Sequence, residues 1–116
     1  MQNNCLFIGW NRPVNNREGG AVEVIDALKN YFQNQIDDGE IGSFEPVRLN
    51  NHAGDLNGFF LVTGAPKSIQ NIEQSDDFVE LCTKCEYYLE DFGVVAGSYA
   101  ESFDKMMNNY KKVIQT

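Results

Sequence analysis

The chain has 116 residues, 42% of them hydrophobic, which favours one folded domain over residues 1–116. Nine Lys and Arg residues against 17 Asp and Glu residues give a net charge of -8. We therefore expect neither nucleic acid nor an anionic membrane as a partner, because their phosphates would be repelled. No apolar run approaches the roughly 18 residues of a membrane span, and no signal peptide is expected. Three cysteines, an odd number, suit a reducing compartment, so we expect the cytoplasm.

The N-terminal part of the chain predicts a strand followed by a long helix. Residues 5–10 (Cys-Leu-Phe-Ile-Gly-Trp) place apolar, β-favouring side chains on both alternating faces. From Gly20 to Asp38 the apolar residues recur at the i, i+3, i+4 spacing of an amphipathic helix. Gly39 follows as a signal for the C-terminal end of that helix.

A β-hairpin is predicted next. Residues 41–50 form its first strand, and Pro46 cannot donate a ladder hydrogen bond, so we expect an edge strand or a bulge there. Residues 50–57 are dense in Asn, Gly and Asp and predict the turn. Residues 58–63 (Gly-Phe-Phe-Leu-Val-Thr) predict the second strand of the hairpin, again with large apolar groups on both faces.

The C-terminal half predicts a short helical turn, a helix, a strand and a last helix. Pro66 opens the turn, and Ser75 is the predicted N-cap of a helix that Gly93 ends. Residues 94–100 predict the fourth strand. The last helix, residues 103–114, is expected to bury its apolar stripe, which consists of Phe103, Met106, Met107, Tyr110 and Ile114.

The order of these elements, β-α-β-β-α-β with an additional C-terminal helix, predicts a ferredoxin-like α+β sandwich. Both crossover helices should cover the same face of the sheet, because each crossover is right-handed. A solvated opposite face would show clean alternation of apolar and polar residues, whereas the first and third strands are apolar on both faces. An exposed patch of that size indicates an interface, so we predict a homodimer in which a second copy covers it.

Three segments of the chain are distinctive: residues 9–13 (Gly-Trp-Asn-Arg-Pro), residues 44–47 (Phe-Glu-Pro-Val) and residues 52–60 (His-Ala-Gly-Asp-Leu-Asn-Gly-Phe-Phe). Together with Glu18 they resemble a small, uncharacterised bacterial family within the dimeric α/β-barrel superfamily. The resemblance implies that two ferredoxin-like sheets close into a dimeric α/β barrel around shared or paired cavities. Members of this superfamily include cofactor-free monooxygenases, isomerases, haem-binding proteins and ligand-binding modules, so the resemblance implies a fold rather than one activity.

An aromatic residue and a cation near the end of the first strand are candidates for binding a ligand. Trp10 and Arg12 share a face if the strand extends that far, and they could stack on a planar molecule and pair with its carboxylate or enolate. The alternative is that Trp10 is a core residue and Arg12 a surface cation. Phe60 of the third strand and Tyr99 at the end of the fourth strand complete the predicted ligand-binding set.

The only histidine of the chain, His52, is the candidate catalytic residue. It could act as a general base near neutral pH, with Asp55 three residues later orienting or charge-stabilising its ring. The alternative is a solvated histidine in a turn whose Gly, Asp and Asn residues only fix the hairpin.

The two cysteines with C-x-x-C spacing, Cys82 and Cys85, fall in the middle of a predicted helix and on its apolar stripe. No strand precedes them to present a redox pair, and no second ligand pair exists to complete a tetrahedral zinc site. We expect both to be small core residues. A haem would need an axial histidine on a cavity wall, whereas His52 lies in a predicted turn. We therefore expect no metal site and no cofactor.

The sequence thus predicts a homodimer that binds a small apolar or aromatic molecule in a cavity beside the sheet. Two alternatives stay open. One is a cofactor-independent monooxygenase or isomerase with His52 as its base, and the other is a non-catalytic module whose role is its dimer surface.

Overall fold

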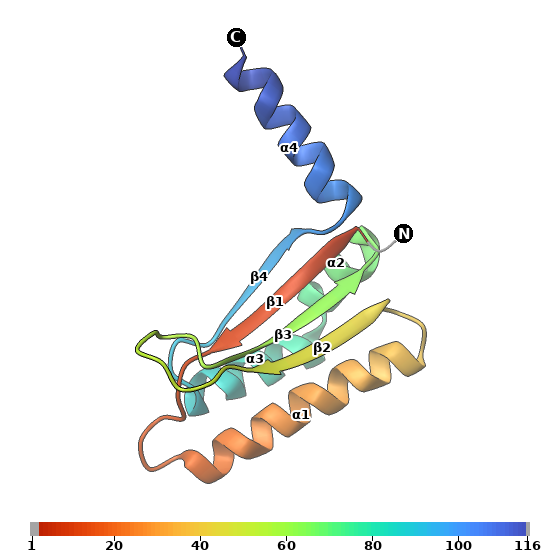
Figure 1. Ribbon diagram of the computed structural model, residues 1–116. Coiled ribbons are helices and arrows are strands. Elements are labelled where there is room, and N and C mark those ends of the chain that lie inside the picture. Colours follow the sequence, from red (N-terminus) through yellow and green to blue (C-terminus); the bar gives the residue numbers. More distant parts are fainter. Residues whose placement is uncertain (1–2, 116) are drawn as a thin grey trace.

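A four-stranded antiparallel sheet with helices packed on one face forms the body of the protein (Figure 1). This computed structural model describes residues 3–115. The sheet has the strand order β2-β3-β1-β4, which confirms the predicted ferredoxin-like α+β topology. Within the described residues no helix is both long and apolar enough to cross a bilayer. The elements follow in the order β1 (Asn4–Trp10), α1 (Glu18–Asp37), β2 (Ser43–Arg48), β3 (Gly58–Gly64), α2 (Pro66–Gln74), α3 (Asp76–Tyr88), β4 (Gly93–Ser98) and α4 (Glu101–Ile114).

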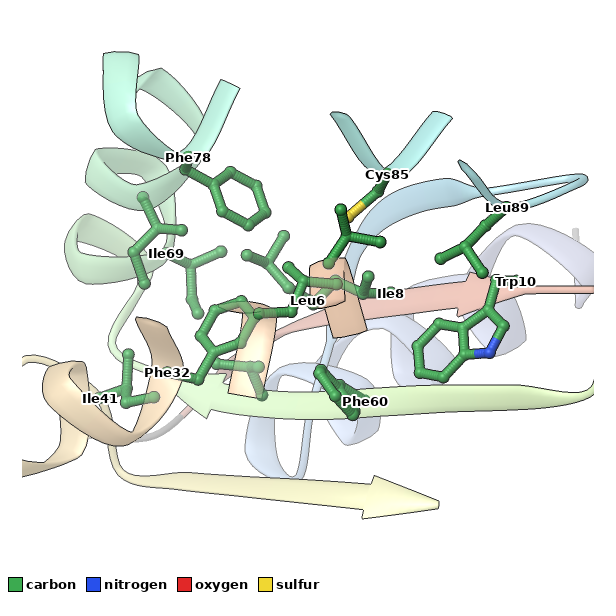
Figure 2. Close-up of a cluster of buried hydrophobic side chains, with 14 of the residues drawn as sticks. Leu6, Ile8, Trp10, Phe32, Ile41, Phe60, Ile69, Phe78, Cys85 and Leu89 are labelled. Carbon is green, nitrogen blue, oxygen red and sulfur yellow. The ribbon is translucent and has the colours of Figure 1, made fainter. Parts of the chain in front are cut away.

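The hydrophobic core lies between the sheet and helices α1, α2 and α3 (Figure 2). The sheet contributes Leu6, Ile8 and Trp10 of β1 together with Phe60 and Val62 of β3, all at most 9% exposed. Because alternate residues of a strand point to opposite faces, these side chains share one face of the sheet. Burial of each such side chain stabilises the fold by about 1.5–3 kcal/mol. The helices and their flanks contribute Ala21, Val24, Leu28, Phe32, Ile69, Ile72, Phe78, Cys85 and Leu89.

Several local predictions are confirmed. Strand β2, which contains Pro46, is an edge strand and pairs antiparallel with β3 as the expected hairpin. The hydroxyl of Ser75 accepts a hydrogen bond from the backbone N–H of Phe78 at 3.4 Å, as expected of the N-cap of α3.

The predicted end of the second long helix is wrong: α3 ends at Tyr88 and not at Gly93. Leu89 adopts an extended backbone and forms an isolated β-bridge with Pro13. The backbone N–H of Glu90 then donates to the carbonyl of Arg12 at 2.8 Å. The helix stops because the residues after Tyr88 pair instead with the segment that follows β1.

The predicted burial of the last helix is also wrong. Its apolar stripe lies in solvent, and none of the side chains of α4 is buried among residues 3–115. The helix follows a tight connection at Ala100, which has a left-handed φ of 54°, and projects away from the sheet (Figure 1). The stripe is therefore 38–77% exposed at Phe103, Met106, Met107, Tyr110 and Ile114.

The face of the sheet opposite the helices carries a second apolar surface, which we call the open face. The rings of Phe7 and Phe59 stack there with centroids 5.0 Å apart. Phe7 pairs in register with Leu61 of β3 and with Val95 of β4, so all three side chains share this face. Val95 is 62% exposed. The prediction that both central strands are apolar on two faces is thus confirmed.

Candidate functional site

A cleft of about 830 Å³ lies between α1 and the edge of the sheet formed by β2. Its walls come from the end of β1 and the residues after it, from residues 46–49, from α1, and from the loop of residues 49–57 that joins β2 to β3. We call it the α1–β2 cleft. It opens on the helical side of the sheet, because Trp10 and Phe60 of its lining are also core residues.

Strand register builds the floor of this cleft. Gly58 pairs with Trp10 on one side and with Arg48 on the other, so the three residues form one row across the sheet. Because Gly58 has no side chain, the indole of Trp10 lies over it: a Cβ at residue 58 would stand only 2.7 Å from the ring. Phe60 meets the indole edge-on, with centroids 5.2 Å apart. The floor is therefore aromatic and closely packed.

The indole nitrogen of Trp10 is the polar atom of this floor. Trp10 is 9% exposed, and its Nε1 would lie 3.1 Å from a Cβ at Gly58, which places the nitrogen over the start of β3. Among residues 3–115 no hydrogen bond from this N–H occurs, and no buried polar side-chain atom there lacks a partner, so this nitrogen is accessible to solvent. A solvent-accessible N–H on an otherwise buried ring is a donor available to a molecule in the cleft.

Three cations surround the floor. Arg12 lies two residues after β1, Arg48 ends β2, and Lys29 comes from α1, one turn after Ile25. Asp26 is the one carboxylate in the lining. The cleft thus combines an aromatic floor with a positively charged rim.

His52 lies in the cleft lining, but its ring is engaged by the loop that carries it. Its Nδ1 accepts a hydrogen bond from the backbone N–H of Gly54 at 2.9 Å, and its Nε2 donates to the carbonyl of Leu56 at 2.7 Å. Asp55 is not among the partners of the ring within residues 3–115, and it lies outside the lining of the cleft. A general base needs a free lone pair, whereas this geometry gives His52 a role in closing the loop.

The side chain of Asn11 anchors the loop of residues 49–57 to the end of β1. Its side-chain oxygen accepts a hydrogen bond from the amide of Asn57, and its Nδ2 donates to a carboxylate oxygen of Asp91 at 3.1 Å. The backbone N–H of Asn57 also donates to the carbonyl of Trp10 at 2.9 Å. These bonds hold the end of β1 against the loop of residues 49–57. They therefore also position Trp10 and Arg12 relative to that loop.

The structure brings together four of the six residues predicted for the site. Trp10, Arg12, His52 and Phe60 line the α1–β2 cleft. Tyr99 does not, because its backbone N–H bonds to the carbonyl of Asn3 at the other end of β1, about 20 Å away along the strand. Sequence reasoning missed Asn11, Lys29 and Arg48.

The two C-x-x-C cysteines lie in and beside the hydrophobic core. Cys85 is fully buried in the core and Cys82 is half-buried beside it, which confirms the expectation of packing. Burial, together with the nearby charges of Cys82 and Glu86, raises the pKa of Cys85 from 9.0 to about 12. Burial likewise raises the pKa of Cys82 to about 11, so both thiols stay protonated near neutral pH. No cluster of metal-ligating side chains occurs in the described part of the chain.

Comparison with known proteins identifies the fold. No family model matches the chain, and no curated protein matches it significantly. A dimeric protein of unknown function and ferredoxin-like fold from Bacteroides fragilis NCTC 9343 has a TM-score of 0.58 at 10% identity, over 83% of this chain and 96% of its own. A dimeric ferredoxin-like protein of unknown function from Jannaschia sp. CCS1 has a TM-score of 0.61 at 9% identity, over 84% and 98%. The predicted resemblance to ferredoxin-like proteins is thus confirmed at the level of the fold.

Proposed function

We propose that the protein is a homodimer that binds a small, planar, apolar or aromatic molecule in the α1–β2 cleft. The observation that carries this proposal is the floor of the cleft, where the indole of Trp10 lies over Gly58 and its solvent-accessible N–H has no partner among the described residues. Ligand sites are commonly clefts of about 300–1,000 Å³ with apolar walls and a few converging polar groups. The cleft has that size and that composition.

Binding without catalysis is the reading that the geometry favours. A cofactor-independent monooxygenase or isomerase would need a base with a lone pair directed at the substrate. Both ring nitrogens of His52 already bond to the backbone of their own loop. A substrate would have to break one of these bonds before His52 could take its proton.

The open face supports the dimer. Phe7, Phe59, Leu61 and Val95 form an apolar surface on the side of the sheet away from the helices. Such a surface on a stable protein usually marks an interface, and a face that pairs with its own copy satisfies two-fold symmetry. Both fold relatives described above are dimeric proteins. A second copy packed sheet against sheet would close a dimeric α/β barrel.

Helix α4 supports the same assembly independently. Phe103, Met106 and Tyr110 lie on one stripe of this helix and are 39–56% exposed. The helix also carries three lysines against two acidic residues, whereas the whole chain has a net charge of -8. Both its apolar stripe and its charge therefore suit the surface of a second copy of this chain.

Native mass spectrometry of the purified full-length protein tests both parts of the proposal. We expect a mass of twice the 13.1 kDa chain, with a small non-covalent adduct that is lost under denaturing conditions. A monomer would overturn the dimer. A dimer free of adducts, with no change in the emission of Trp10 on screening planar aromatic compounds, would overturn ligand binding and favour a module that acts only through its dimer surface.

A further inference from the structure

The cations of this chain are unevenly distributed. The whole sequence contains nine Lys and Arg residues and 17 Asp and Glu residues. Three of the nine nevertheless line the α1–β2 cleft, where Asp26 is the single carboxylate. The rim of the cleft is therefore positive in a protein that is otherwise acidic, and a cleft lined by one sign of charge concentrates ions of the opposite sign.

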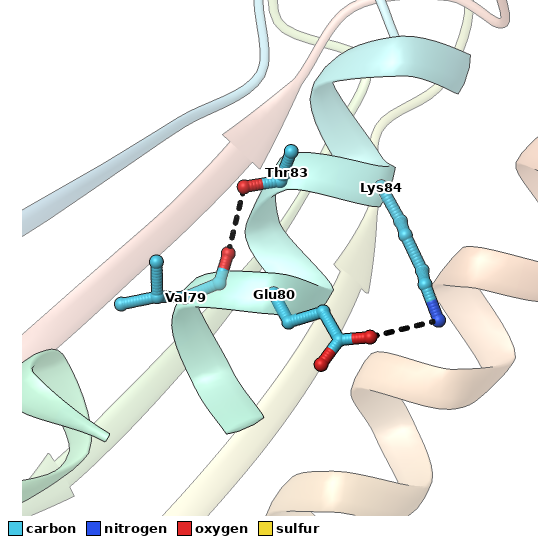
Figure 3. Close-up of polar contacts among 4 residues, drawn as sticks. All are labelled: Val79, Glu80, Thr83 and Lys84. Atoms are coloured by element: carbon cyan, nitrogen blue, oxygen red, sulfur yellow. Dashed lines mark hydrogen bonds and ion pairs between the residues drawn. The ribbon is translucent and has the colours of Figure 1, made fainter. Parts of the chain in front are cut away.

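None of these three cations has a partner among the described residues, whereas two of the other six cations of the chain do. The guanidinium carbon of Arg17 lies 3.8 Å from the centroid of the Tyr87 ring, and the guanidinium also donates a hydrogen bond to the backbone carbonyl of Tyr87. Lys84 pairs with Glu80 at 3.7 Å on α3 (Figure 3). Within residues 3–115 no carboxylate or hydrogen-bond acceptor pairs with the side chains of Arg12, Lys29 or Arg48.

The three cations approach the aromatic floor from different elements. Arg48 stands in the same row as Gly58 and Trp10, about 10 Å from Trp10 across two strand spacings. Arg12 follows Trp10 by two residues, and Lys29 lies above them on α1. Asp26 is the one carboxylate in the lining against these three cations, so a bound anion would offset the remaining excess of positive charge.

We infer that the ligand of the α1–β2 cleft is an anion, with a planar apolar body over Trp10 and Phe60 and a carboxylate or similar group held by Arg12 and Arg48. This inference rests on the proposed function and specifies its ligand class. The planar guanidinium groups can each donate two parallel hydrogen bonds to such a group, and Lys29 adds a point charge. The Nε1–H of Trp10, which lies near Gly58, supplies one further donor. A cation or a neutral hydrocarbon would leave these donors without a partner.

A matched pair of probes tests the inference on the full-length protein by isothermal titration calorimetry. The pair is 1-naphthoate and its neutral amide 1-naphthamide, which share the ring system and differ in charge. We expect naphthoate to bind about tenfold or more tightly than naphthamide, and its affinity to fall as salt is raised. Inorganic phosphate, which has the charge but no ring, should bind much more weakly than naphthoate.

Three variants locate the interaction. Arg12→Gln and Arg48→Gln should each weaken naphthoate binding by about fivefold or more while leaving naphthamide within about twofold. Lys84→Gln removes a cation from α3, outside the cleft lining, and should change neither affinity. Urea unfolding of each variant confirms that the fold is kept.

The outcomes separate this inference from the proposed function. Equal binding of naphthoate and naphthamide would overturn the anionic ligand but leave the aromatic cleft in place. Binding of phosphate as tight as that of naphthoate would overturn the requirement for a planar body. Failure of all three probes to bind would overturn both the inference and the ligand-binding function.

Discussion

The indole of Trp10 lies across the backbone of Gly58, so close that a Cβ at residue 58 would stand 2.7 Å from the ring. Gly58 has a neighbour on each side in the sheet, Trp10 on β1 and Arg48 on β2. The missing side chain therefore lets an aromatic ring from the central strand reach toward the edge strand. The floor of the α1–β2 cleft depends on this one close approach.

Replacing this glycine should damage both the fold and the cleft. Gly58→Ala forces the Trp10 ring to move, and we expect a loss of about 1–3 kcal/mol in the free energy of unfolding. Urea unfolding followed by the emission of Trp10, the single tryptophan, measures both effects. Gly19→Ala is the matched control, because nothing lies within 4 Å of a Cβ there and the helix should gain up to about 1 kcal/mol. A Gly58→Ala protein with unchanged stability and emission would contradict this packing.

The bridge made by Asn11 should contribute more to stability than an exposed amide does. Asn11 bonds to both Asn57 and Asp91 and is 9% exposed, so Asn11→Ala would leave partly buried polar groups unpaired. We expect a loss of about 1–3 kcal/mol in the free energy of unfolding. Gln33→Ala, which removes only an exposed bond to Asp37, should change it by less than about 0.5 kcal/mol. Equal effects of the two substitutions would show that Asn11 does not anchor the loop.

His52→Ala separates a loop-closing role from a catalytic one. Without the imidazole, the backbone N–H of Gly54 loses its acceptor and the carbonyl of Leu56 its donor. We expect faster hydrogen exchange across residues 52–57 and a loss of stability no larger than about 1 kcal/mol. If exchange in the loop were unchanged while turnover of a candidate substrate disappeared, His52 would be a base and the enzyme alternative would stand.

The open face should tolerate a charge less well than the helical surface does, provided that a second copy covers it. Val95 on the open face and Val22 on α1 are 62% and 61% exposed in the single chain, which makes them a matched pair. Val95→Glu would bury a carboxylate in the dimer interface, and we expect the dimer dissociation constant to rise about tenfold or more. Val22→Glu should leave it unchanged. Sedimentation velocity over a dilution series measures both, and an intact Val95→Glu dimer would contradict pairing through this face.

The buried thiols predict a loss of stability in alkali. The pKa of Cys85 is raised from 9.0 to about 12 in the folded protein, so the unfolded chain releases this proton at lower pH than the folded chain does. The contribution of the thiol to stability is thus complete below about pH 9 and declines as the pH rises toward 12. Urea unfolding at several values between pH 8 and about pH 11 measures the decline. Cys85→Ala should be less stable at pH 8 but show a flatter decline, and a parallel decline would contradict the assignment.

The sequence predicted those features that depend on local pattern. The alternation of residues 5–10 and 58–63 predicted both the core and the open face, and Pro46 predicted the edge strand. Trp10 and Arg12 were predicted to lie together because they are two residues apart.

What the sequence could not predict depends on contacts between distant segments. Arg48 joins the cleft through its register with Gly58, and Lys29 through the packing of α1 on the sheet. The apolar spacing of residues 103–114 predicted an amphipathic helix correctly, but periodicity does not say which surface covers the stripe. Helix α3 was predicted too long because Leu89 fits the apolar stripe, although its backbone pairs with Pro13.

The indole N–H of Trp10 gives one resolved signal in a ¹H–¹⁵N NMR spectrum, because the chain has a single tryptophan. Titration of the full-length protein with 1-naphthoate while this signal is followed tests the α1–β2 cleft as a ligand site most directly. We predict a saturable shift of the Trp10 signal, accompanied by shifts of the Arg12 and Arg48 side-chain signals. A Trp10 signal that stays in place throughout the titration, or shifts confined to residues outside the cleft, would contradict the account.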